Sequence, residues 1–163
     1  MPVIQVSVNQ SRIKIDHLRL ERAARATLNA LGYTDAELSI TIVDDAEMLS
    51  LNRQYRGEDS TTDVLSFSLT EGEFADVEPH MLGDVVISAP TAEWISRQHN
   101  VALASVLDLL LVHGILHLVG YDHEQGDEPA QRMDMKTMEL MKLLGHRETH
   151  FDWFWNHGAQ LFS

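Results

Sequence analysis

The chain has 163 residues, no cysteine, and a net charge of −13 from 25 acidic and 12 basic side chains. Its hydrophobic content of 44% and its length are those of a globular protein with one domain and a single core. The absence of cysteine excludes a disulfide framework and a thiolate metal site. The acidic balance weighs against broad, charge-driven binding to nucleic acid, although a local basic patch is compatible with it.

The first part of the chain predicts two strands separated by a helix. Residues 3–8 and 37–43 alternate apolar and polar side chains, which indicates half-buried strands. A helix over residues 17–31 lies between them, and this spacing is typical of a parallel β–α–β unit. Asp44 or Asp45 then caps a short helix that ends near residue 55.

Two more strands are predicted at residues 64–69 and 83–88, close enough in the chain to pair. The acidic stretch 70–81 contains Gly and Pro and is expected to be an exposed connection between them. Pro90 opens a helix that runs to about residue 98. The sequence therefore predicts a mixed α/β fold with a small four-stranded sheet.

Residues 101–119 form the most apolar predicted helix, which we expect to be buried across the sheet. His113 and His117 are four residues apart and therefore project from one face, one turn from each other. Gly120 suits the left-handed turn that ends a helix, so that His123 can return to the same point. Three imidazoles with an open fourth position describe a catalytic zinc site.

The metzincin metalloproteases have their histidines and glycine at the same relative positions. They carry a glutamate, the general base, directly after the first histidine, whereas this chain has Gly114 there. The pattern therefore keeps the metal geometry without the base for peptide hydrolysis. It predicts one zinc ion per chain, although imidazole ligands also suit nickel, iron and cobalt.

The final part of the chain predicts a helix over residues 128–144, capped by Asp127, and then an aromatic tail. We expect one domain over residues 1–145 and a tail of unknown role over residues 146–163. The tail has two of the three tryptophans, and three arrangements are open: docking on the body, docking on a second subunit, or mobility. The first residues do not form a signal peptide, and the apolar run in 101–119 is too short to span a bilayer, so we expect a cytoplasmic protein.

Three stretches resemble the YbeY family of bacterial endoribonucleases: HGILHLVGYDH at 113–123, NRQYRGEDSTTDVLSF at 52–67 and GDVVIS at 83–88. With the order of elements between them, the resemblance covers most of residues 3–145. It implies a single-domain α/β (α+β) fold with a small mixed sheet and a central buried helix that carries the histidines. About five helices are expected in total.

The family resemblance implies a zinc-dependent endoribonuclease that cleaves single-stranded RNA. It implies roles in maturation of the 3′ end of small-subunit ribosomal RNA and in ribosome quality control. The three metal ligands carry over to His113, His117 and His123, and the family's catalytic arginine carries over to Arg56. The planar donors of Arg56 suit a phosphate that develops charge. The acidic charge also favours a basic small-subunit ribosomal protein as a partner.

Two alternatives belong to other functional classes. The first is a ribosome-assembly factor in which zinc is mainly structural, to which the acidic charge lends weight. The second is a metal-dependent hydrolase of another substrate class, such as a peptidase, for which Gly114 is the adverse feature. The nucleophile of RNA cleavage, water or the RNA 2′-hydroxyl, is left open.

Overall fold

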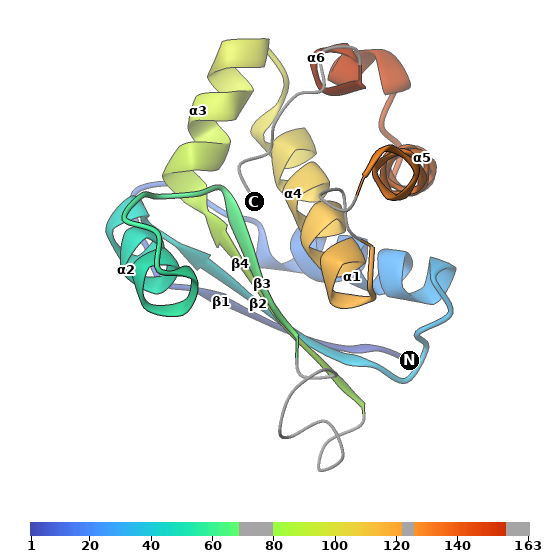
Figure 1. The fold of residues 1–163 in the computed structure, drawn as a ribbon, viewed down its shortest axis with the longest axis horizontal. Helices are drawn as coiled ribbons and strands as arrows, with labels where there is room; N and C mark the ends of the chain where they lie inside the picture. Colours follow the sequence, from blue (N-terminus) through green and yellow to red (C-terminus); the bar gives the residue numbers. More distant parts are fainter. Residues whose placement is uncertain (69–79, 122–125, 156–163) are drawn as a thin grey trace.

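The computed structural model describes residues 1–68, 80–121 and 126–155, except for the side chain of Trp155. One mixed sheet lies between two helical layers (Figure 1). Helices α1 and α4 cover one face of this sheet and α2 covers the other. The mixed α/β class that the sequence predicts is therefore confirmed.

The four predicted strands pair in the order β1-β2-β4-β3. β1 (Val3–Val8) is parallel to β2 (Glu37–Val43), as expected of a β–α–β unit, and β2 is parallel to β4 (Met81–Ser88). β3 (Val64–Ser68) pairs with β4 in the antiparallel direction and forms an edge of the sheet. The expected connection 70–81 lies mostly outside the described residues, and its last residue is already part of β4.

Each face of the sheet has its own core. Side chains alternate along a strand, so that Val85 of β4 points toward α4 and Val86 points toward α2. The larger core joins the sheet to α1, α3, α4 and α5. The smaller core lies beneath α2 and contains Val43, Met48, Leu65 and Val86. The sheet is thus buried on both sides where β4 crosses the molecule.

Three of the described helices begin at a side-chain cap. The bounds of the described helices are α1 (His17–Ala30), α2 (Asp45–Arg56), α3 (Ala89–His99), α4 (Leu103–Leu118), α5 (Asp127–Leu143), a 3₁₀ turn η1 (Glu148–Phe151) and α6 (Asp152–Trp155). The side chains of Asp16, Asp44 and Ser88 accept backbone N–H groups at the starts of α1, α2 and α3. The expected cap at Asp127 is wrong, because α5 begins at Asp127 itself and Gly126 precedes it. The Asp127 carboxylate therefore lies in the first turn, where the helix dipole favours negative charge.

α4 crosses β3 and β4, and nearly all of its residues are buried, as its apolar composition predicts. α3 precedes it and packs against it. In the part of the chain that the structure describes, no single helix is both long and apolar enough to cross a membrane. α3 and α4 reach that length and composition only together, across a bend of 120°.

A buried carboxylate joins α4 to two other segments. Asp108 of α4 is 1% exposed and accepts hydrogen bonds from both terminal nitrogens of Arg19 in α1, at 3.0 Å for Nη1 and Oδ1. His146, just after α5, lies 2.6 Å from Asp108 through its Nε2 atom. Because a buried carboxylate is costly without partners, Arg19 and His146 satisfy a charge that the core does not otherwise accommodate.

The segment 146–155 packs on the body of the protein. Phe151 is fully buried and Phe154 is nearly so, and both belong to the larger core. The Trp153 indole stacks on the His99 ring at the end of α3, with ring centroids 3.9 Å apart. Of the three arrangements that the sequence leaves open, this segment therefore adopts docking on the body. Residues 156–163 lie outside the described part of the chain.

We expect Phe151→Ala to lower the free energy of unfolding by about 3–5 kcal/mol, since it removes a fully buried aromatic ring. Met135→Ala is the control, because Met135 is 71% exposed and its loss should change stability by no more than about 0.5 kcal/mol. Urea unfolding monitored by circular dichroism measures both. Equal midpoints for the two variants would show that Phe151 does not contribute to the core.

Candidate functional site

The end of α4 positions the candidate site. The helix finishes at Leu118, and Gly120 follows with a φ of +101°, a left-handed conformation that favours glycine. The Tyr121 N–H donates to the Leu116 carbonyl at 2.9 Å, which satisfies the end of the helix and turns the chain. The predicted stop at Gly120 is therefore confirmed.

His113 and His117 lie side by side on α4, as their spacing predicts. Their Nε2 atoms are 3.1 Å apart, and their rings cross at 80° with centroids 4.6 Å apart. His113 is 4% exposed, whereas His117 is partly exposed. Two nitrogens bound at about 2.0–2.1 Å to one tetrahedral ion are about 3.3 Å apart, so the pair fits two ligands of a shared zinc ion.

The third predicted ligand, His123, lies outside the described residues, as does Asp122. Over residues 1–68, 80–121 and 126–155, no group of three His, Cys, Asp or Glu side chains is placed to hold a metal ion. A third protein ligand at this position would have to come from residues outside these ranges. The assignment of His123 stays a prediction.

Gly114 brings α4 unusually close to the sheet. A Cβ atom at this position would lie 2.7 Å from Cγ1 of Val85 and 3.2 Å from Oγ of Ser66. The Ser66 hydroxyl donates a hydrogen bond of 2.9 Å to the Gly114 carbonyl. Glycine is therefore required by packing, and a glutamate at the metzincin position would point into β4.

Arg56 is the last residue of α2, on the sheet face opposite α4. Its neighbour Tyr55 packs edge-on against Phe67 of β3, with ring centroids 5.0 Å apart, which places this end of α2 at the β3 edge. Arg56 pairs with Glu58 at 3.7 Å, and no hydrogen bond or ion pair among the described residues joins it to His113 or His117. The structure brings the two histidines together, and the role of Arg56 stays a prediction.

The loop after Arg56 is held by its own contacts. The Asn52 amide donates to the Ser60 carbonyl at 2.7 Å, and Arg53 Nε donates to the Asp59 carboxylate at 2.8 Å. At the end of the loop, the buried Asp63 carboxylate accepts the Val64 N–H at 2.8 Å. Asp63 thus fixes the start of β3, which supports a structural role for this residue.

Two polar side chains on the sheet were not identified from the sequence pattern. Ser66 reaches α4 through the hydrogen bond to Gly114 described above. Asp84 of β4 lies on the face opposite Val85, and burial raises its pKa, although a hydrogen bond from Ser39 opposes the shift. The only sequence indication for Asp84 is a charged residue inside the apolar run GDVVIS.

The fold and site define a small mixed α/β protein with two adjacent histidines on a buried helix. A family model described as Endoribonuclease YbeY matches residues 5–145. The chain is 44% identical over 142 residues to Endoribonuclease YbeY of Geobacter sulfurreducens, with 86% of this chain and 95% of the relative covered. It is 42% identical over 140 residues to Endoribonuclease YbeY of Aquifex aeolicus, with 85% and 91% covered.

The solution structure of TM1509 from Thermotoga maritima has a similar fold. The TM-score is 0.60 at 26% identity, with 96% of this chain and 94% of that chain covered. Together, the family match and the extent of the similarity show that this chain belongs to the YbeY family.

We expect Gly114→Ala to lower the free energy of unfolding by about 1–3 kcal/mol, because the new methyl group overlaps Val85. Without this overlap, replacing glycine by alanine would stabilise the helix by about 1 kcal/mol. A loss of stability therefore shows that the overlap with Val85 outweighs the helix preference. Urea unfolding measures the effect of Gly114→Ala in the parent and in a Val85→Ala variant. The loss of unfolding free energy should be smaller in the Val85→Ala variant, where the overlapping methyl groups are absent. A gain in stability on Gly114→Ala alone would contradict the tight approach.

Proposed function

We propose that this protein is a zinc-dependent endoribonuclease that cleaves single-stranded RNA. The observation that carries the proposal is the convergence of the His113 and His117 Nε2 atoms to 3.1 Å on a buried helix. Membership of a family whose members are named endoribonucleases supports RNA as the substrate. The hydrolysis of phosphodiester bonds needs a metal ion or strong acid–base groups, and the histidine pair favours the metal.

The proposed zinc ligands are His113, His117 and His123. Burial of His113 among apolar side chains orients its ring and keeps water away from it. Gly114 sets the distance between this helix and the sheet, and Gly120 starts the turn that leads to His123. A zinc ion bound here supplies a Lewis acid that lowers the pKa of water toward about 7.

Arg56 is the proposed phosphate-binding residue. Its side chain is 35% exposed, and its Nη2 atom lies 3.7 Å from Glu58, which is longer than a hydrogen bond and leaves donors for a substrate. An RNA strand that passes the β3 edge would contact Arg56 and the face that carries the histidines. The planar guanidinium then stabilises charge on the phosphate oxygens.

The proposed cellular substrate is small-subunit ribosomal RNA, in maturation of its 3′ end and in ribosome quality control in the cytoplasm. The net charge of −13 favours a basic small-subunit ribosomal protein as the partner that presents this RNA. A second candidate is an assembly factor in which the zinc is structural. It is favoured because α2, which ends at Arg56, packs on the sheet face opposite the histidine-bearing α4. If Arg56 does not reach a phosphate at the histidine pair, the site lacks its proposed phosphate-binding group and the zinc serves only the fold.

We expect His117→Ala to remove bound zinc and RNA cleavage together, because a tetrahedral site loses one of its three protein ligands. Elemental analysis measures the metal, and gel analysis of a labelled single-stranded RNA measures cleavage. His17→Ala is the control, since His17 is an exposed residue of α1. Retention of zinc by His117→Ala would show that this histidine is not a ligand.

We expect Arg56→Ala to slow cleavage by about 10²–10³-fold while zinc content and the unfolding midpoint stay unchanged. Arg132→Ala is the control, because Arg132 is an exposed arginine on α5 that also pairs with a glutamate. Equal cleavage rates for the two variants would exclude the role of Arg56. A zinc-loaded parent that does not cleave RNA and unfolds when the metal is removed would establish the structural alternative.

A further inference from the structure

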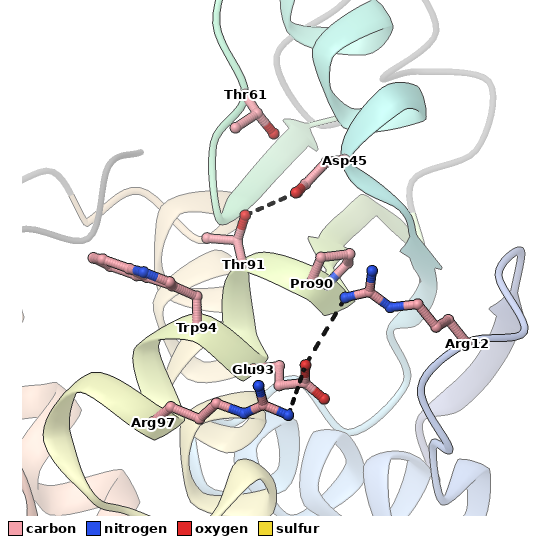
Figure 2. A pocket seen from close by; sticks show the side chains of 8 residues that line it. All are labelled: Arg12, Asp45, Thr61, Pro90, Thr91, Glu93, Trp94 and Arg97. Carbon is pink, nitrogen blue, oxygen red and sulfur yellow. Dashed lines mark hydrogen bonds and ion pairs between the residues drawn. The ribbon is translucent and has the colours of Figure 1, made fainter.

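A pocket of about 500 Å³ lies apart from the histidine pair, on the outer face of α3 (Figure 2). Four segments form its wall: the β1–α1 connection, the start of α2, the loop after Arg56, and α3. They contribute, in that order, Arg12, Asp45, Thr61, and a set on α3 that includes Trp94 and Arg97. Because Thr61 belongs to the loop that begins at the end of α2, the pocket adjoins the segment that carries Arg56.

Trp94 provides a large aromatic surface at this pocket. Its side chain extends from α3 and is 53% exposed, although a tryptophan ordinarily buries most of its area. Exposed indole rings on charged surfaces provide stacking platforms for the bases of single-stranded nucleic acids. The ring is therefore placed to stack on an unpaired base.

Two arginines flank Glu93, the residue that precedes Trp94 on α3. Glu93 lies 3.9 Å from Arg12 and 3.4 Å from Arg97, both longer than a typical N–H···O hydrogen bond (Figure 2). The arginine side chains are 75% and 77% exposed. Glu93 itself is only 27% exposed, so the exposed guanidinium groups are the mobile partners of these ion pairs. They can turn toward a phosphate group and form charge-assisted hydrogen bonds with it.

The walls of the pocket are held in place. The Asp45 carboxylate at the start of α2 accepts hydrogen bonds from the hydroxyls of Ser88 and Thr91, at 2.6 Å and 3.0 Å. These bonds fix the starts of α2 and α3 relative to each other. Trp94 and Arg97 therefore stand on a helix whose start is held in place, which reduces the entropy lost when a strand binds.

We propose that this pocket is a second binding site for single-stranded RNA, with a base stacked on Trp94 and phosphates held by Arg12 and Arg97. The inference rests on the proposed endoribonuclease function and deepens it, because it assigns residues that hold the RNA outside the point of cleavage. The chain carries a net charge of −13, so RNA affinity depends on such local groupings of arginine. Glu93 competes with the phosphates for both guanidinium groups.

The test is the affinity for a fluorescein-labelled, 2′-O-methylated single strand, measured by fluorescence anisotropy at several salt concentrations. We expect Trp94→Ala to weaken binding about tenfold without changing the dependence on salt, since stacking releases no counterions. We expect Arg97→Gln to weaken binding and to reduce the slope of log affinity against log salt by about 0.7. Glu93→Gln should tighten binding.

Matched controls separate the pocket from general surface effects. Arg132→Gln removes an exposed arginine that also pairs with a glutamate one turn away, and Tyr33→Ala removes an exposed aromatic ring elsewhere. Affinities for Trp94→Ala and Arg97→Gln that equal those of the controls would overturn the inference. Equal affinity for a duplex and a single strand would also overturn it, because paired bases do not stack on Trp94.

Cleavage by the parent distinguishes this inference from the proposed function. If the parent cleaves labelled RNA and the pocket variants bind as the parent does, only the pocket assignment fails. If the parent neither binds nor cleaves the RNA, both fail together.

Discussion

The close contact between α4 and the sheet at Gly114 determines how the rest of the molecule is built. A methyl group there would overlap Val85, and the Ser66 hydroxyl ties the same residue to β3. Since His113 and His117 lie one residue before and three residues after this contact, the depth of the helix also sets the position of both imidazoles. The packing of α4 and the position of the two histidines therefore both depend on glycine at position 114.

The fold was largely predictable because its elements carry local signals. The strand at 37–43 alternates apolar and polar residues, and its buried side chains follow that alternation. Helix starts were accurate where a side chain caps them, as Asp44 does, and less accurate where none does. α4 begins after Ala102, which has no cap, and α5 begins at Asp127 behind a glycine. A helix start without a side-chain cap is hard to predict, because no particular residue type marks it.

The candidate site was predictable only in part. Helical geometry alone brings His113 and His117 together, so four-residue spacing was sufficient. His123 lies outside the described residues and remains a prediction. The contacts of Asp108 with Arg19 and His146 were not predictable, because they join residues 89 and 38 positions apart. The exposure of Trp94 was not predictable either, because whether a single aromatic residue is buried depends on which other parts of the chain pack over it.

The docked segment 146–155 has a consequence for synthesis of the protein. The family match ends at residue 145, yet Phe151 and Phe154 fill part of the core beneath that region, and His146 partners the buried Asp108. A nascent chain that has emerged only as far as residue 145 contains every position matched by the family model. It still lacks Phe151 and Phe154, which belong to the larger core. The core described above is therefore complete only after this segment has left the exit tunnel.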